Sequence, residues 1–297
     1  MTLAISPEVA SALADGGAVV ALESTIFSPF GLPAPANREA LDRCLAAVRA
    51  GGAVPAMTAV LDGVARVGLA PDQHDRILAG GVKVAERDLP VAISQGLPVG
   101  VTTVSASLAL SATSGVAVFA TGGIGGVHRD AEVTGDVSAD LGAIAAYPVV
   151  TVSAGAKAFL DLARTLEQLE TLGVPVLGWR TDDFPMFWCR SSGLPVPHRI
   201  DDAAAAVGVA RAQRALGVPR GVLVAVPIPE DAAIPREQVE AAIDRAVTDA
   251  GTGAAATPRV LAAIADATDG RTVRANIVLA EHNASVAAAV AREFTQV

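Results

Sequence analysis

Short apolar runs bounded by turn residues alternate along the chain with longer segments in which apolar residues recur at helical spacing. This alternation is typical of an α/β fold. The pattern predicts strands at residues 18–22, 116–120, 149–152, 174–178 and 222–226, and helices at residues 38–50, 138–146, 158–172, 201–216, 236–250 and 273–292. An Asp62-Gly63 pair between the β-prone runs 56–61 and 64–69 predicts a hairpin with a two-residue turn.

The segment 89–127 carries no charged residue and is long enough to cross a bilayer. Pro90, Pro98 and many Gly, Ser and Thr residues interrupt it, and it ends in a glycine-rich run. We therefore interpret it as buried elements of an α/β core and expect no membrane span.

Composition narrows the class of protein further. Of the 297 residues, 52% are hydrophobic and 18% are charged, so a sizeable core is expected, in a single domain over residues 1–297. A net charge of −9 argues against nucleic acid as a partner. Cys44 and Cys189 have the spacing of neither a metal site nor a disulfide framework, and the first residues lack a basic signal-peptide region. We expect reduced thiols and a cytoplasmic location.

Lysine is almost absent. Of the 22 basic residues, only Lys83 and Lys157 are lysine, and the rest are arginine. A desolvated lysine can lose its proton and act as a nucleophile, which arginine cannot do. Lys157 follows the predicted strand 149–152, where α/β active sites usually lie, although survival of both lysines on the surface by chance remains an alternative.

Three further segments carry candidate groups. Four glycines between Thr121 and Arg129 allow a ligand to approach the backbone closely, and their N–H groups are candidates for an anion-binding nest; a structural turn is the alternative. His128 and Arg129 at its end favour a phosphate or sugar site. In the segment 136–140, Ser138 or Asp136 is a candidate N-cap, but two carboxylates beside a basic turn also suggest a divalent cation.

Two polar features lie in predicted regular structure. Glu23 ends the first predicted strand, and since burying a carboxylate is costly, a catalytic role is favoured. Asn276 and Asn283 lie seven residues apart on one face of the last predicted helix, for which a solvated face is the plainer explanation.

Together, these segments resemble the pseudouridine-5′-phosphate glycosidases. The resemblance covers nearly the whole chain from Val19 and rests on motifs that occur in the family's order. The motifs are Ala21-Leu-Glu-Ser-Thr25, Gly52-Ala-Val-Pro-Ala56, Lys83, Thr102-Thr-Val104, the run from Thr121 to Arg129, Asp136-Val-Ser-Ala-Asp140, Ala154-Gly-Ala-Lys157 and Arg190-Ser-Ser-Gly193.

The resemblance implies a three-layer α/β/α sandwich, a homotrimer, and an enzyme that reversibly splits the C–C glycosidic bond of pseudouridine 5′-phosphate into uracil and ribose 5-phosphate. It implies Mn²⁺, or another divalent cation such as Mg²⁺, bound by Asp136. By motif, Lys157 matches the nucleophile and Glu23 the proton donor. Substrate contacts are expected from Lys83, Val104, His128, Arg129, Ser138, Ala139, Asp140 and Asn283. Ribose ring opening followed by a Lys157 Schiff base would let carbon leave without the oxygen protonation that ordinary glycosidases use.

The chain departs from the family pattern around the expected pocket. The run Ile26-Phe-Ser-Pro-Phe-Gly-Leu-Pro33 lacks a His-Gly pair, Gly135 replaces a bulkier residue, and Asp130 replaces a small one. A C-glycoside synthase that joins ribose 5-phosphate to another carbon nucleophile therefore stays open as an alternative. A Schiff-base aldolase acting on a sugar phosphate, and a ribose-binding protein without catalysis, are further alternatives.

Overall fold

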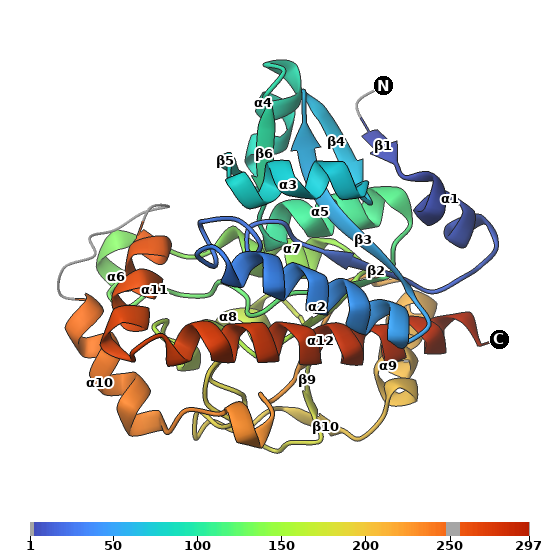
Figure 1. Ribbon diagram of the computed structural model, residues 1–297. Helices are drawn as coiled ribbons and strands as arrows, with labels where there is room; N and C mark the ends of the chain where they lie inside the picture. The colour runs from blue at the N-terminus through green and yellow to red at the C-terminus, as the bar shows by residue number, and fades with distance from the viewer. Residues whose placement is uncertain (1–2, 248–255, 297) are drawn as a thin grey trace.

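The computed structural model describes residues 3–247 and 256–296, which form a mixed α/β structure (Figure 1). The strands are β1 (Leu3–Ile5), β2 (Val19–Leu22), β3 (Val54–Leu61), β4 (Val64–Val67), β5 (Val82–Val84), β6 (Val99–Thr102), β7 (Val118–Ala120), β8 (Val150–Ser153), β9 (Val176–Trp179), β10 (His198–Ile200) and β11 (Val222–Ala225). The helices are α1 (Pro7–Ala14), α2 (Ala36–Ala50), α3 (Pro71–Ala79), α4 (Leu89–Ser94), α5 (Val104–Ser114), α6 (Ala131–Thr134), α7 (Ala139–Ala146), α8 (Leu162–Thr171), α9 (Ala203–Ala215), α10 (Arg236–Val247), α11 (Ala256–Ala267) and α12 (Arg271–Thr295).

One sheet runs through the centre. Its strands follow the order β3-β2-β7-β8-β11-β9-β10, and each neighbouring pair in this series is parallel. Beyond β3 the sheet continues through antiparallel pairs with β4 and β6, to which β1 and β5 add in parallel. Because β2, β7 and β8 are parallel neighbours, the segments that follow them meet at one edge of the sheet.

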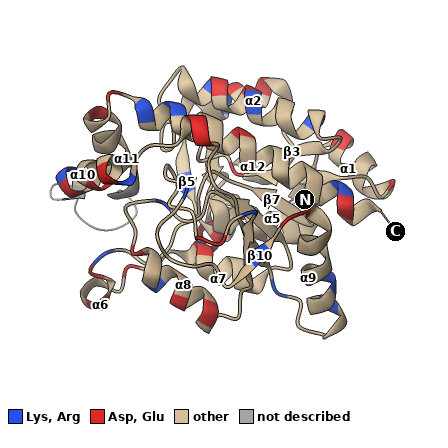
Figure 2. Cartoon of the chain, turned by 90° about the horizontal axis from the view of Figure 1, so that it is seen from below, with Lys and Arg blue, Asp and Glu red and all other residues tan. Residues whose placement is uncertain are grey.

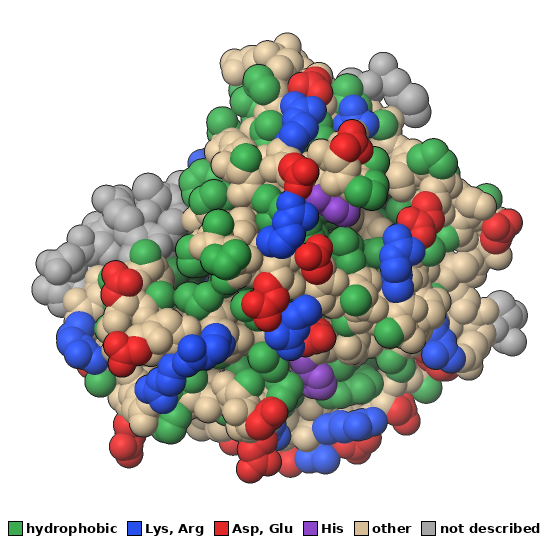
Figure 3. Space-filling view, in the orientation of Figure 1, with side chains coloured by type: hydrophobic (Ala, Val, Ile, Leu, Met, Phe, Trp, Pro, Cys, Tyr) green, Lys and Arg blue, Asp and Glu red, His purple; other side chains and the backbone are tan. Residues whose placement is uncertain are grey.

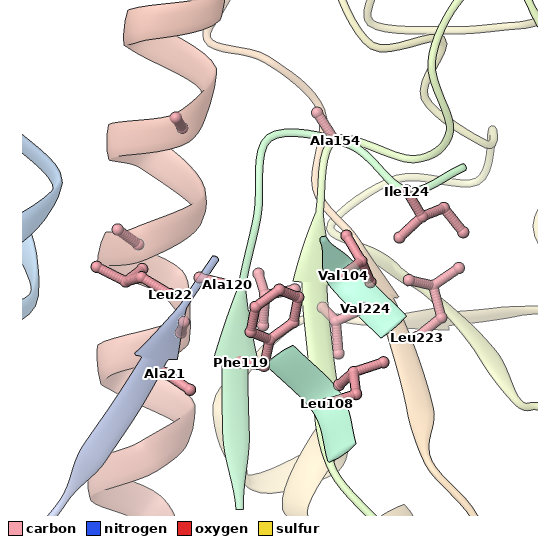
Figure 4. Close-up of a cluster of buried hydrophobic side chains, with 14 of the residues drawn as sticks. Ala21, Leu22, Val104, Leu108, Phe119, Ala120, Ile124, Ala154, Leu223 and Val224 are labelled. Carbon is pink, nitrogen blue, oxygen red and sulfur yellow. The ribbon is translucent and has the colours of Figure 1, made fainter. Parts of the chain in front are cut away.

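Helices cover both faces of the sheet. The long helix α12 contacts β2, β7 and β8 and lies beside α2 and α9 (Figure 1). On the other face, α5 contacts β2, β3 and β7, and α7 packs on α5 and β11. The core between these layers includes Phe119 of β7 and Leu108 of α5, both wholly buried (Figure 4). The prediction of a three-layer α/β/α sandwich is confirmed.

Charged side chains lie mostly on the outer helices, and the central strands carry almost none (Figure 2). On the face formed by α2 and α12, acidic and basic side chains are interspersed (Figure 3). Arg43 of α2, for example, donates through Nε to Glu281 of α12 at 3.0 Å. On this face, therefore, the described residues form no patch of a single charge sign.

The regular elements match the sequence pattern where that pattern is strong. Each predicted strand and helix is present, and the hairpin β3–β4 turns at Asp62 and Gly63, whose φ angles are 54° and 73°. The helix predicted at 158–172 starts only at Leu162, because Asp161 accepts a hydrogen bond from the Arg164 N–H at 3.0 Å and caps the helix there. The last three residues of the predicted helix 236–250 lie outside the described residues.

The charge-free segment forms α4, β6, α5, β7 and the start of the glycine-rich run. Among the described residues, no helix combines the length and the apolar character that a membrane crossing requires. In α5, every residue from Val104 to Ser111 is buried between the sheet and α7. A helix buried on all sides has no polar face, which explains why periodicity did not predict it.

Candidate active site

A cavity of about 340 Å³ opens where β2, β6, β7 and β8 end. Of the side chains singled out from the sequence, the structure brings nearly all to this cavity: Glu23, Lys83, Val104, His128, Asp136, Ser138, Ala139, Asp140 and Lys157 line it. Arg129 and Asn283 do not line it. Residues that are more than 130 positions apart in sequence therefore share one site, as expected for loops that follow parallel strands.

Glu23 lies at the end of β2 and is only 7% exposed. The Thr121 hydroxyl donates a hydrogen bond to its Oε1. The pKa of Glu23 is raised to about 7, chiefly by burial and also by Asp140, although Lys157, the Thr121 hydrogen bond and Lys83 act to lower it. A carboxyl group with such a pKa exchanges protons readily at neutral pH, which suits a proton donor that must also accept.

A chain of buried hydroxyl groups holds the strand end that carries Glu23. Ser24 accepts from the Thr102 N–H at 2.8 Å, and its Oγ lies 3.0 Å from Thr102 Oγ1. Thr102 Oγ1 lies 2.8 Å from Thr58 Oγ1, which donates to Ser107 Oγ at 2.8 Å. The ends of β2 and β6 are thus tied to β3 and α5, and Glu23 is positioned by structure that excludes water.

Lys157 lies four residues beyond β8, on a loop that is paired with the glycine-rich run. Its N–H donates to the Ile124 carbonyl at 3.1 Å. Gly155 before it adopts φ +71°, and a Cβ there would lie 2.2 Å from the Pro185 carbonyl oxygen, so only glycine fits. The backbone therefore fixes where the Lys157 side chain enters the cavity.

Lys83 reaches the same cavity from β5, where it pairs in register with Val101 of β6. Burial, and next the nearby Lys157 ammonium, lower the pKa of Lys83, while Asp140 and Glu23 act to raise it. The two lysines and two carboxylates therefore lie within electrostatic range of one another. This arrangement excludes the interpretation that both lysines survive as unrelated surface residues.

Asp140 is 6% exposed and uses both carboxylate oxygens for the backbone. Oδ1 accepts from the Ser105 N–H at 3.0 Å, at the start of α5, and Oδ2 accepts from the Gly125 N–H at 2.8 Å. Ser138, the N-cap of α7, accepts from the Asp140 N–H at 3.2 Å, which confirms the predicted cap. Asp140 thus holds the glycine-rich run against α5 and places its negative charge beside both lysines.

The glycine-rich run packs more closely than an anion-binding nest would. Gly122, Gly123, Gly125 and Gly126 all lack a positive φ, and the N–H groups of Ile124, Gly125 and Val127 donate to protein oxygens. A Cβ on Gly125 would lie 2.2 Å from Ser138 Oγ. The run is therefore a structural turn that brings Ser138 and Asp140 close, three of its N–H groups already donate to protein oxygens, and anion binding by its other N–H groups stays a prediction.

Asp136 and His128 face each other at the rim. His128 Nδ1 lies 3.9 Å from Asp136 Oδ2, and the His128 N–H donates to the Asp136 carbonyl at 3.0 Å. Burial lowers the pKa of His128, an effect that Asp136 opposes. Within residues 3–247 and 256–296, no group of three or more His, Cys, Asp or Glu side chains is arranged to hold a metal ion.

Two of the candidates, Arg129 and Asn283, lie outside the cavity lining. Arg129 points to Asp244, with Nη1 3.5 Å from Oδ1. Asn283 is 1% exposed and its Nδ2 donates to the carbonyls of Thr121 and Gly122 at 2.8 and 3.1 Å. It supports the glycine-rich run and does not line the cavity. Asn276, 7% exposed, does line it, so the interpretation of a solvated helix face is wrong for both asparagines.

Sequence reasoning missed the apolar wall of the cavity. Ile26 and Phe30 come from the loop after β2, Phe187 from the loop after β9, and Leu261 from α11. Phe187 has φ 56°, a strained conformation for an aromatic residue, and a Cβ on Gly123 would lie 2.7 Å from its ring. The departure from the family pattern at residues 26–33 pointed to this wall, but nothing in the sequence indicated Phe187.

Comparison with known proteins identifies the family. The family model described as indigoidine synthase A like protein matches residues 8–293. The chain belongs to this family. Curated pseudouridine-5′-phosphate glycosidases of Methylobacterium nodulans and Sorangium cellulosum are 48% and 47% identical, over 97% and 99% of this chain and 87% and 94% of theirs. The prediction of an enzyme from this family is confirmed.

Solved members of the indigoidine synthase A-like family share the fold. The crystal structure of the prealnumycin C-glycosynthase in complex with ribulose 5-phosphate superposes with a TM-score of 0.91 at 36% identity, covering 99% of this chain and 97% of that one. An indigoidine synthase A-like protein from Thermotoga maritima gives a TM-score of 0.91 at 32% identity, covering 100% and 97%.

Glu23 gives the first testable expectation. Its folded-state pKa of about 7 lies above the usual 4.5, so the folded protein binds more protons between these values. The stability of wild type relative to Glu23→Gln should therefore fall as pH rises from 4.5 to 7, by about 3 kcal/mol in total, and stay constant above pH 7. Urea unfolding of both proteins from pH 4 to 8 measures this difference, and a flat difference would show that Glu23 ionises normally.

Proposed function

We propose that the enzyme reversibly cleaves the C–C glycosidic bond of pseudouridine 5′-phosphate to uracil and ribose 5-phosphate. The observation that carries the proposal is the shared cavity in which Lys157, Lys83 and the buried Glu23 lie within electrostatic range. The names of the curated relatives support this substrate.

The residues suggest the sequence of events. Glu23, whose raised pKa favours the protonated form at neutral pH more than in an exposed glutamate, would give its proton to the ribose ring oxygen and open the ring. Lys157, as the free amine, would form a bond to C1′ as the bond from C1′ to the ring oxygen breaks and its electrons stay on the protonated oxygen. Uracil would then take up a proton at the carbon bonded to C1′, and the nitrogen lone pair would expel it: the electrons of the C–C bond stay with uracil, and C1′ becomes the carbon of an iminium ion. Water would then release ribose 5-phosphate and regenerate the amine. Lys83 would supply positive charge and Asp140 negative charge beside the reacting groups.

A divalent cation, Mn²⁺ or Mg²⁺, is also part of the proposal. The residues present fit a cation that is held by few protein ligands, because Asp136 presents a carboxylate to the cavity and His128 lies beside it. Mg²⁺-type ions commonly take one or two carboxylates and complete their shell with water and substrate oxygens. When bound, the cation would offset the negative charge of the substrate. Both oxygens of Asp140 already accept from backbone N–H groups, so Asp136 is the carboxylate that would hold it.

The phosphate must find positive charge in an acidic protein. Arg87 lines the cavity, its side chain is 84% exposed, and its guanidinium lies 3.5 Å from Asp88, a longer contact than a bidentate pair. We propose that Arg87 and Lys83 bind the phosphate, in place of Arg129 and the nest expected from the sequence.

Cytoplasmic location and trimer assembly stay predictions. Cys44 and Cys189 are buried and free, which agrees with a reducing compartment.

Incubation with pseudouridine 5′-phosphate and Mn²⁺ tests the proposal through the release of free uracil. The nucleoside should be a poorer substrate by about a hundredfold to ten-thousandfold in kcat/KM, since two charge-assisted contacts are lost. Arg87→Gln should reduce the ratio of kcat/KM for the nucleotide to that for the nucleoside. Arg129→Gln, the matched control outside the cavity lining, should leave this ratio unchanged. A nucleoside that reacts within a few-fold of the nucleotide would contradict a phosphate-reading site.

One observation favours a second function. The wall formed by Ile26, Phe30, Phe187 and Leu261 is apolar, and the prealnumycin C-glycosynthase has the same fold. A C-glycoside synthase that joins ribose 5-phosphate to a less polar carbon nucleophile would use the same Lys157. Competition between uracil and larger aromatic acceptors for ribose 5-phosphate distinguishes the two.

A further inference from the structure

Asn276 has a buried side-chain amide whose oxygen accepts a hydrogen bond from the protein, whereas its nitrogen donates to no group among the described residues. Its Oδ1 accepts from Trp188 Nε1 at 2.7 Å, and Trp188 is wholly buried. Because an indole N–H can only donate, this bond assigns the amide orientation: Oδ1 faces Trp188 and Nδ2 faces away from it. Asn276 is 7% exposed and lines the cavity, and within the described residues its Nδ2 has no acceptor.

The contrast with Asn283 shows that this free donor is specific to the cavity. Asn283 lies seven residues further along α12, and its Nδ2 donates to two backbone carbonyls. The Asn276 Nδ2 is not among the buried side-chain atoms that lack a partner, so it is accessible in the cavity and can donate to a ligand acceptor there.

Several contacts place Asn276 at the apolar end of the cavity. The Trp188 ring packs against the Phe187 ring in a tilted arrangement, with ring centroids 4.9 Å apart and an interplanar angle of 51°. A Cβ on Gly122 would lie 2.9 Å from Ile26, 3.3 Å from Leu279 and 3.6 Å from Phe187, so Ile26 and Phe187 meet beside the turn of α12 that follows Asn276. The charged groups that would bind and open the sugar lie instead at the strand ends. A flat, largely apolar aglycone fits the Asn276 end.

We infer that Trp188 is a positioning residue: by holding Asn276 Oδ1, it presents only N–H donors to the aglycone, and the cavity therefore selects a carbonyl oxygen and rejects an amino group there. The inference rests on the proposed function and names the chemistry by which that site reads its carbon nucleophile. An amino group on the aglycone would place its N–H donors opposite the N–H donors of Asn276, with no acceptor between them. A buried site discriminates strongly against such a pair.

Two substitutions test the orientation. Asn276→Asp keeps an acceptor for Trp188 Nε1 but turns the cavity-facing group into an acceptor. Trp188→Phe removes the indole N–H, so the amide is free to present either face. The measured quantity is the ratio of kcat/KM for uracil to that for cytosine and for isocytosine, with ribose 5-phosphate at pH 8. The ratio cancels the effect of each substitution on folding and on the shared lysine chemistry.

We expect Asn276→Asp to lower the ratio about tenfold to a hundredfold for one of the two amino bases, and Trp188→Phe to lower it to a smaller extent. The base that gains identifies the carbonyl that Asn276 reads. Trp179→Phe, at the other tryptophan, is the control and should leave both ratios unchanged. If Trp188→Phe fails to fold, Asn276→Asp decides alone.

The outcomes separate the two levels of proposal. If wild type consumes uracil and both variants keep the wild-type ratios, the assignment of Trp188 and Asn276 is wrong and the proposed function stands. If wild type gives no product with uracil and no Lys157 adduct with ribose 5-phosphate, the proposed function is wrong and the inference falls with it.

Discussion

Replacing Lys157 with alanine is expected to lower turnover below about one-thousandth of wild type, because the covalent route that we propose would lose its nucleophile. Borohydride reduction in the presence of ribose 5-phosphate should trap an adduct on Lys157, visible by mass spectrometry of peptides. Lys157→Arg keeps the positive charge but offers no free amine, so it should be as inactive as Lys157→Ala.

Lys83 provides the matched control for this trap. It is the second lysine of the chain, it lines the same cavity, and burial lowers its pKa, so a reactive amine in that position is chemically reasonable. We expect Lys83→Ala to keep the adduct on Lys157 while KM for phosphorylated substrates rises. An adduct that maps to Lys83, or its complete absence, would overturn the assignment of the nucleophile.

Removal of the divalent cation is expected to have the second large effect. Exhaustive chelation should abolish uracil release, since the proposed site then loses the positive charge that offsets the negative charge of Asp136 and of the substrate, and Mn²⁺ should restore it. In Asp136→Ala, Mn²⁺ binding measured by electron paramagnetic resonance should weaken by more than about tenfold, as expected for the loss of a carboxylate ligand.

Asp130→Ala is the control for the metal experiment, because Asp130 is an exposed carboxylate on the same segment and does not line the cavity. It should bind Mn²⁺ as wild type does. Full activity of the chelated enzyme would mean that Asp136 and Ser138 serve only the backbone around the start of α7.

The sequence predicted the parts of the fold in which pattern and burial agree. Strands such as β2 and β11 are buried on both faces and therefore read as continuous apolar runs. Helix α5 escaped prediction because its serines bond within the protein interior, with Ser107 and Ser111 donating to backbone carbonyls one turn earlier. Short edge strands such as β1 and β5 carry too few residues for any period to appear.

The candidate site was predictable where chemistry is local and was missed where it depends on packing. Lys157 and Glu23 could be found because each follows a strand and each is an uncommon residue in its place. Asn276 could not be assigned, since its role depends on a bond to Trp188, 88 positions away in sequence. Arg129 was predicted because it adjoins the glycine-rich run, but its side chain turns outward to Asp244, and nothing in the sequence pattern pointed to Arg87.

The two lysines and the apolar wall of the cavity come from different segments of the chain, and this affects how such an enzyme can change during evolution. Lys83 lies on β5 and the Lys157 loop is paired with the glycine-rich run, whereas Ile26 and Phe30 lie in the connection from β2 to α2 and Leu261 lies on α11. Mutations at these apolar positions can therefore alter which carbon acceptor is accepted without disturbing the two lysines of the proposed chemistry. New products become accessible to selection in small steps, with a working reaction retained at each one.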